Sequence, residues 1–155
     1  MIQRKQTVYL FFCIVCFIIC AVIPLGKITS EGMGAPAIAG CIGVVDPNTG
    51  VMSYPYYALP VFFLALNAFQ SLAIIFMYKN RKAQALNCYI QFIAILTEYI
   101  VAGALVYVNC ISGTGNHFSP SFGLCLPVVA LIFLLLAHKG IMDDERLVRA
   151  ADRIR

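Results

Sequence analysis

The stretch TVYLFFCIVCFIICAVIPL, residues 7–25, contains no charged residue and decides the class of the fold. As a helix it would cross roughly 30 Å of hydrocarbon at 1.5 Å per residue. Arg4 and Lys5 precede it, and a signal peptide also combines a charged start with an apolar centre. The small residues Ala37, Ile38 and Ala39, which would suit cleavage, come far beyond the apolar run. We therefore interpret residues 7–25 as a transmembrane helix.

The composition of the whole chain indicates a membrane protein. Of its 155 residues, 61% are hydrophobic and 12% are charged, and the mean hydropathy is +0.87. An ordinary soluble domain has roughly 25% charged residues, and one of this length could not bury so much apolar surface. The basic residues lie in short clusters beside apolar runs, which is typical of topology determinants. The net charge of +4 therefore does not indicate nucleic-acid binding.

Three further apolar runs predict an all-α bundle of four transmembrane helices in a single domain, residues 1–155. These runs cover residues 58–78, 86–108 and 120–137. A short basic turn, residues 79–82, separates the second and third helices. Ser119 and Pro120 fit the N-cap and the first residue of the fourth helix, because proline needs no N–H partner there.

The loop of residues 26–57 carries a strong turn signal, Asp46-Pro47-Asn48-Thr49-Gly50. Proline presets φ for a type I turn, and glycine can adopt the left-handed conformation after it. Short apolar stretches, residues 42–45 and 51–57, flank this turn. The pattern predicts a small extracytoplasmic β-hairpin between the first two helices.

The basic residues predict the orientation of the chain. Ten of the eleven Lys and Arg residues fall on one side of the predicted helices, and only Lys27 falls on the other. The ten are Arg4, Lys5, Lys79, Arg81, Lys82, Lys139, Arg146, Arg149, Arg153 and Arg155. Because cytoplasmic loops carry the excess of positive charge, both termini are expected in the cytoplasm.

The tail, residues 139–155, has the spacing of a short cytoplasmic helix. Asp143 is a suitable N-cap, and Glu145 and Arg149 form an i, i+4 pair. This helix would present either a face for anionic lipid or a docking surface for a protein partner. The residues of this face are Leu147, Arg149, Ala151, Arg153, Ile154 and Arg155.

Glu98 lies near the middle of the third predicted helix, where an ionised side chain costs at least ~2.5 kcal/mol. Asn67 and Gln70 lie at a similar depth in the second helix, and Gln91 lies seven residues before Glu98. These four side chains are predicted to form one polar cluster between the two helices. The cluster would act either as a proton or cation relay or as a neutral, hydrogen-bonded contact between helices.

Seven cysteines lie mostly within apolar runs. Cys13, Cys16 and Cys20 share one face of the first helix, but no histidine or acid accompanies them, so close helix packing is favoured over a metal or haem site. Three outer cysteines, Cys41, Cys110 and Cys125, leave open whether a disulfide forms. The only CxxC is predicted to lie within the membrane, which argues against a thiol oxidase.

Three segments resemble a known family of membrane proteins. They are the N-terminus MIQRKQTVYL (1–10), the turn FMYKNRKAQ (76–84) and the tail KGIMDDERLVRAADRIR (139–155). The chain is similar along its length to small four-helix inner-membrane proteins of the Bacteroidetes, grouped as a domain of unknown function. The resemblance implies a multi-pass protein of the bacterial inner membrane and assigns no catalytic residue.

No catalytic, metal-binding or cofactor motif stands out in the sequence. We therefore expect a non-enzymatic accessory or structural subunit without a cofactor, which packs with another membrane protein or with copies of itself. Small residues such as Ala94, Ala102 and Gly103 would allow this close packing. The alternative is a minimal oligomeric transporter, or a protein that handles protons or cations through Glu98.

Overall fold

The computed structural model describes residues 5–29, 35–45, 49–53, 59–78, 80–108 and 117–152. Helices dominate this part of the chain, and five short strands lie between them. In chain order the elements are α1 (Lys5–Val22), β1 (Gly26–Thr29), β2 (Ala37–Ala39), β3 (Val44–Val45), β4 (Met52–Ser53), α2 (Leu59–Phe76), α3 (Arg81–Val106), β5 (His117–Pro120), the 3-10 helix η3 (Phe122–Cys125) and α4 (Leu126–Asp152).

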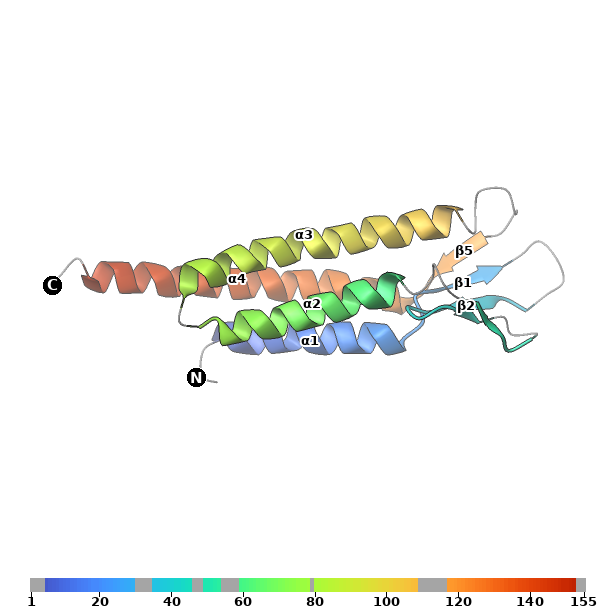
Figure 1. Ribbon diagram of the computed structural model, residues 1–155, viewed down its shortest axis with the longest axis horizontal. Helices are drawn as coiled ribbons and strands as arrows, with labels where there is room; N and C mark the ends of the chain where they lie inside the picture. The colour runs from blue at the N-terminus through green and yellow to red at the C-terminus, as the bar shows by residue number, and fades with distance from the viewer. Residues whose placement is uncertain are drawn as a thin grey trace.

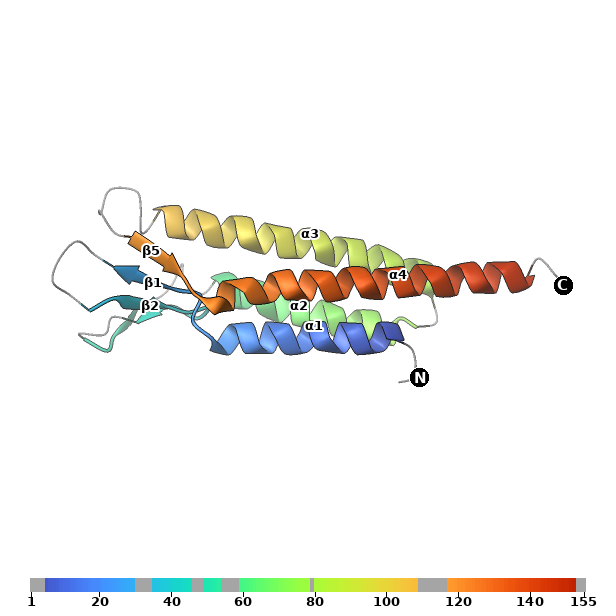
Figure 2. The ribbon, with the colours of Figure 1, turned by 180° about the vertical axis from the view of Figure 1, so that it is seen from behind.

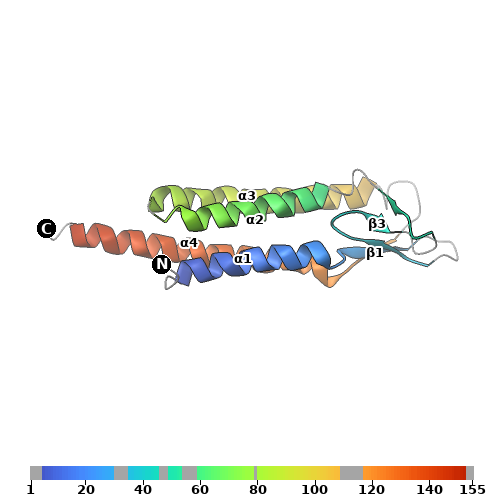
Figure 3. The same ribbon diagram turned by 60° about the horizontal axis from the view of Figure 1, so that its bottom comes forward.

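The four α-helices form a bundle in two layers, with α2 and α3 over α1 and α4 (Figure 3). The principal contacts join α1 to α2 and α4, and α3 to the same two helices. Large apolar side chains such as Leu10, Phe17, Leu64 and Ile95 are fully buried along the shared axis. Dispersion and close packing, which remain available in lipid, therefore stabilise the contacts between the helices.

The outward faces of the helices are also apolar. Phe69, Ile93, Ile100 and Leu135, for example, lie exposed on the surface. Three helical segments are long and apolar enough to cross a membrane, namely α1, α3 and the segment Phe122–Ala150, which consists of η3 and most of α4; α2 is a shorter apolar helix. A bundle that is apolar outside as well as inside is suited to lipid as its solvent.

The predicted hairpin is confirmed, but it is one edge of a larger sheet. Strand β3 pairs with β4 in antiparallel register, Val45 opposite Met52, and Gly50 has the expected positive φ of 66°. The strand order is β4-β3-β2-β1-β5. This sheet lies at one end of the bundle, here called the sheet end (Figure 2).

The expected start of the fourth helix at Pro120 is wrong. Residues 117–120 instead form β5, which pairs with β1 so that Ile28 lies opposite Phe118. The Ser121 N–H then donates to the Leu25 carbonyl at 2.9 Å, and η3 follows before α4 begins. Pairing with a strand about ninety residues earlier satisfies this backbone better than an isolated helical turn would.

The basic turn between the second and third helices is shorter than predicted. Asn80 is the N-cap of α3, and its Oδ1 accepts from the Ala83 N–H at 3.2 Å. Arg81 and Lys82 therefore belong to the first turn of α3, five residues before the expected start of that helix.

The prediction of a separate C-terminal helix is also wrong, because α4 continues without interruption to Asp152. Asp143 lies inside α4 and is not an N-cap. Nothing in residues 138–142 stops the helix, since the single glycine there, Gly140, lies at an ordinary helical position, where an added Cβ would be 3.6 Å from the Gln6 side chain. Figure 1 shows α4 extending well beyond the other helices at the end opposite the sheet.

Candidate functional site

A buried polar cluster lies between α2 and α3. The Asn67 Nδ2 donates to Glu98 Oε2 at 3.0 Å and to the Phe63 carbonyl at 3.0 Å. From α3, the Gln91 Nε2 donates to the Asn67 carbonyl at 3.0 Å and to Ser71 Oγ. Glu98 is only 6% exposed, and Asn67, Ser71 and Gln91 are fully buried. The cluster joins the two helices by hydrogen bonds that no lipid could replace.

This cluster contains more hydrogen-bond acceptors than donors. The Asn67 Oδ1 and the Gln91 Oε1 are buried and have no hydrogen-bond partner within the described residues. The Ser71 Oγ donates its proton to the Asn67 carbonyl at 3.0 Å, so it does not satisfy them. A proton on Glu98 would add a donor where the cluster lacks one. The arrangement is thus suited to a carboxylic acid that stays neutral or exchanges a proton.

The structure brings three of the four predicted cluster residues together and places Gln70 elsewhere. The Gln70 Nε2 donates to the Asn87 carbonyl at 3.4 Å, away from Glu98. Ser71 is the member that sequence reasoning missed. Its position four residues after Asn67 could have identified it, because residues at i and i+4 lie on one helix face.

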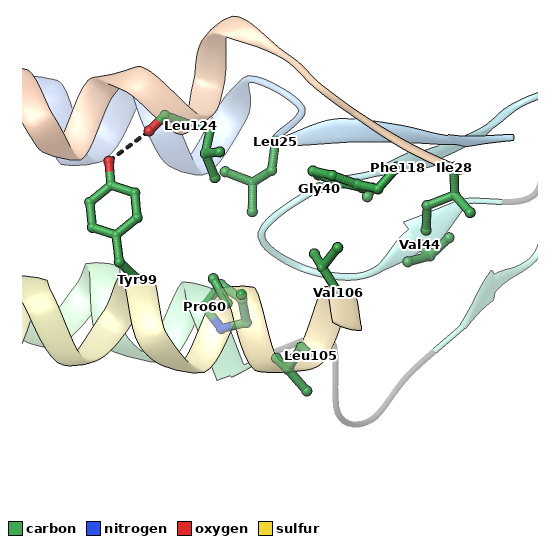
Figure 4. Close-up of a pocket in the computed structure, with 13 residues that line it drawn as sticks. Leu25, Ile28, Gly40, Val44, Pro60, Tyr99, Leu105, Val106, Phe118 and Leu124 are labelled. Atoms are coloured by element: carbon green, nitrogen blue, oxygen red, sulfur yellow. Dashed lines mark hydrogen bonds between the residues drawn. The ribbon is translucent and has the colours of Figure 1, made fainter. Parts of the chain in front are cut away.

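An apolar cavity of about 310 Å³ lies at the sheet end, between the last turns of α3 and the strands (Figure 4). Val106, Ile28, Val44 and Phe118 contribute to its walls. Tyr99 also lines the cavity, and its hydroxyl donates to the Leu124 carbonyl at 2.6 Å. Gly103 also lines this space, and a Cβ added there would meet no other atom within 4 Å.

A smaller void of about 20 Å³ adjoins this cavity and reaches Glu98. Pro60, Tyr99 and Leu124 line both spaces. The small void is large enough for a single water molecule. Glu98 therefore has a one-water-sized space beside it, and beyond that space lies the larger apolar cavity.

Two cysteines of α1 form hydrogen bonds with α4 and with η3. The Cys13 Sγ donates to the Ala130 carbonyl at 3.2 Å, and the Cys20 Sγ donates to the Gly123 carbonyl at 3.3 Å. No group of three His, Cys, Asp or Glu side chains suited to a metal ion occurs within the described residues. Cys41 and Cys125 are free thiols, and Cys110 lies outside the described part of the chain.

The predicted docking face of the tail lies on the projecting part of α4. Leu147 is 69% exposed, and the Arg149 side chain binds the Glu145 carboxylate through Nη2 at 2.9 Å. Ala151 lies within α4, whereas Arg153, Ile154 and Arg155 lie outside the described residues. Close to the bundle, Asp144 accepts a hydrogen bond from Gln6, and its carbonyl accepts one from Arg81 Nη1 at 2.6 Å.

A family profile described as a domain of unknown function, DUF4293, matches residues 2–154. The chain belongs to the DUF4293 family. A search of curated proteins gives no match. DUF4293 membership agrees with the resemblance seen in the sequence and assigns no role to Glu98 or to any other residue. The function must therefore be argued from the geometry.

Proposed function

We propose that this protein is a four-span protein of the bacterial inner membrane with both termini in the cytoplasm. Lys5, Arg81, Lys82, Lys139 and Arg149 belong to the end opposite the sheet, and Lys27 lies on β1 of the sheet itself. This distribution supports a cytoplasmic position for the end opposite the sheet. The helix α2 is short, but its seventeen-residue apolar part, Pro60–Phe76, reaches the lower limit for a span.

We further propose that the protein acts without catalysis, as a small subunit that packs against another membrane protein. The observation that carries this proposal is the projection of α4 beyond the bundle (Figure 1), in a part of the helix where Leu147 lies exposed. A helix that extends past its own neighbours cannot bury such a side chain within the chain. Contact with a partner at the membrane surface would bury Leu147.

The test is to purify the tagged full-length protein in a mild detergent and to identify co-purifying proteins by mass spectrometry. We expect a stoichiometric partner that Leu147→Asp removes and that binds again when both purified proteins are mixed. Val148→Asp is the matched control, because it makes the same change on an adjacent face of the helix. Truncation at residue 143 would be less informative, since it also removes Asp144 and its contact with Gln6. Equal loss in both variants, or no partner, would contradict the proposal.

The second candidate function is proton or cation handling through Glu98. The unpaired oxygens of Asn67 and Gln91 beside this acid favour it. The apolar lining of the cavity beyond Glu98 at the sheet end opposes it, because a proton path needs water or polar groups. In proteoliposomes loaded with a pH-sensitive dye, a transporter would show a proton flux that Glu98→Gln abolishes and that Thr97→Val, on the exposed face, retains. Absence of flux in the unaltered protein would remove this candidate.

A further inference from the structure

The crevice between α3 and α4, at the end opposite the sheet, combines a basic rim with an apolar floor. A groove of about 270 Å³ opens between the first turns of α3 and the projecting part of α4. Three cationic side chains, Arg81, Lys82 and Arg149, line it together with a single carboxylate, Glu145. Its other walls are formed mainly by Leu86, Tyr89 and Met142.

The charged side chains at the rim differ in the partners that they bind. Glu145 forms an ion pair with Arg149, whose Nε and Nη2 donate to its carboxylate at 3.1 Å and 2.9 Å. Arg81 is held at the rim by the hydrogen bond from its Nη1 to the Asp144 carbonyl. The Lys82 side chain is exposed, and no ion pair joins it to any residue that the structure describes. The rim therefore offers excess positive charge to an anion.

A second, apolar space continues this groove toward the middle of the bundle. It has a volume of about 180 Å³ and is lined by Phe92, Leu134, Leu135 and His138, among others. Tyr89 lines both spaces, and its ring packs edge-on against His138 at 4.5 Å. The Nε2 of His138 is buried without a hydrogen-bond partner in the described part of the chain. The His138 ring therefore lies beside the point where the charged groove and the apolar space adjoin.

From these features we infer that the α3–α4 crevice binds one anionic phospholipid of the cytoplasmic leaflet. The phosphate group lies among Arg81, Lys82 and Arg149, the glycerol ester region reaches His138, and an acyl chain follows Leu135 and Phe92. Ten residues separate Lys82 from Phe92, about 15 Å along a helix, which is half of the ~30 Å hydrocarbon thickness. The crevice thus spans one leaflet. An acidic peptide would match the rim but would leave the apolar half unfilled.

This inference rests on the proposed membrane placement but not on the proposed subunit role. The test uses the full-length protein in a neutral detergent, with native mass spectrometry to measure its affinity for added phosphatidylglycerol. Phosphatidylcholine and inorganic phosphate serve as the other two probes. We expect binding of phosphatidylglycerol in preference to phosphatidylcholine, and no displacement of the lipid by millimolar phosphate.

Two pairs of variants locate the site. Lys82→Gln should weaken binding of phosphatidylglycerol about fivefold, the contribution of one basic residue near a lipid headgroup, and Lys139→Gln, outside the crevice, should leave it unchanged. Leu135→Trp should fill the apolar space and abolish binding, whereas Leu136→Trp, which does not line it, should not. Equal affinity for phosphatidylcholine, equal effects within either pair, or displacement by phosphate alone would each overturn the inference.

Discussion

At the scale of single residues, the hydrogen bond from Asn67 to Glu98 is the contact whose loss is most informative. Asn67→Leu should lower the free energy of unfolding by about 1 kcal/mol, the usual size of such a contact between membrane helices. Glu98→Gln should cost less, because a carboxamide oxygen still accepts from Asn67. Unfolding by added SDS in micelles measures both, with the lipid-facing change Thr97→Val as the control. A larger loss for Glu98→Gln would show that the carboxylic acid itself stabilises the bundle.

Two glycines give a second test at this scale. A Cβ at Gly123 would lie 2.6 Å from the Pro24 carbonyl oxygen, whereas one at Gly103 meets nothing within 4 Å. Gly123→Ala should therefore lower the midpoint of thermal unfolding and cost about 1–3 kcal/mol, the usual range for overpacking. Gly103→Ala should raise stability by about 0.5–1 kcal/mol, because alanine favours the helix. Equal effects of the two changes would mean that η3 does not pack against the end of α1 as described.

At the scale of elements, the junction between β5 and α4 depends on the backbone and not on a side chain. The Ser121 N–H donates to the Leu25 carbonyl, and the Ser121 hydroxyl makes no capping bond. Ser121→Pro should therefore cost about 1–3 kcal/mol, because it leaves that carbonyl without a donor. Ser121→Ala should change the thermal midpoint little. A clear loss of stability for the alanine variant would contradict this account of the junction.

Local patterns in the sequence predicted those elements that depend only on residues close together in the chain. Hydrophobic runs of sufficient length located the four helices, and the turn signal ending in Gly50 located the hairpin of β3 and β4. Strands β1 and β5 have no such pattern, since they exist because residues 26–29 and 117–120 pair across the sheet. Ser119 and Pro120 look like a helix start locally, and the distant pairing overrides that preference.

The tail and the polar cluster also differ in part from what local sequence patterns predict. Asp143 is suited to an N-cap by residue type, but a suitable cap residue does not interrupt a helical backbone that lacks a helix breaker. For the cluster, depth in the membrane predicted both Asn67 and Gln70 as neighbours of Glu98, and the seven-residue spacing along α3 predicted Gln91. The depth of a residue in the membrane does not determine which face of its helix the residue occupies. A residue at i+4 lies about 40° from Asn67 and one at i+3 about 60° in the other direction, so Ser71 faces the cluster and Gln70 faces Asn87.

At the scale of the whole molecule, the two ends of the bundle are built differently. At the sheet end, Leu25 lies between α1 and β1, and its N–H donates to the Ala39 carbonyl of β2 at 2.8 Å. Its carbonyl accepts from the N–H of Ser121, which follows β5. The opposite end carries the basic residues and the projecting α4, held to α1 and α3 by the contacts of Asp144 with Gln6 and Arg81. A sheet end closed by backbone hydrogen bonds and a charged, projecting end suit a protein whose interactions occur on one side of the membrane.

The orientation follows from this asymmetry and can be tested on the intact chain. With the positive end in the cytoplasm, green fluorescent protein fused after Arg155 should fluoresce and alkaline phosphatase fused there should be inactive. Phosphatase inserted after Gly50, in the turn between β3 and β4, should be active, because a loop tip tolerates insertion. Exchanging Arg81 and Lys82 for glutamine should weaken this preference, whereas Lys27→Gln should not. An active phosphatase after Arg155 would reverse the proposed topology and would place the basic rim of the α3–α4 crevice in the outer leaflet.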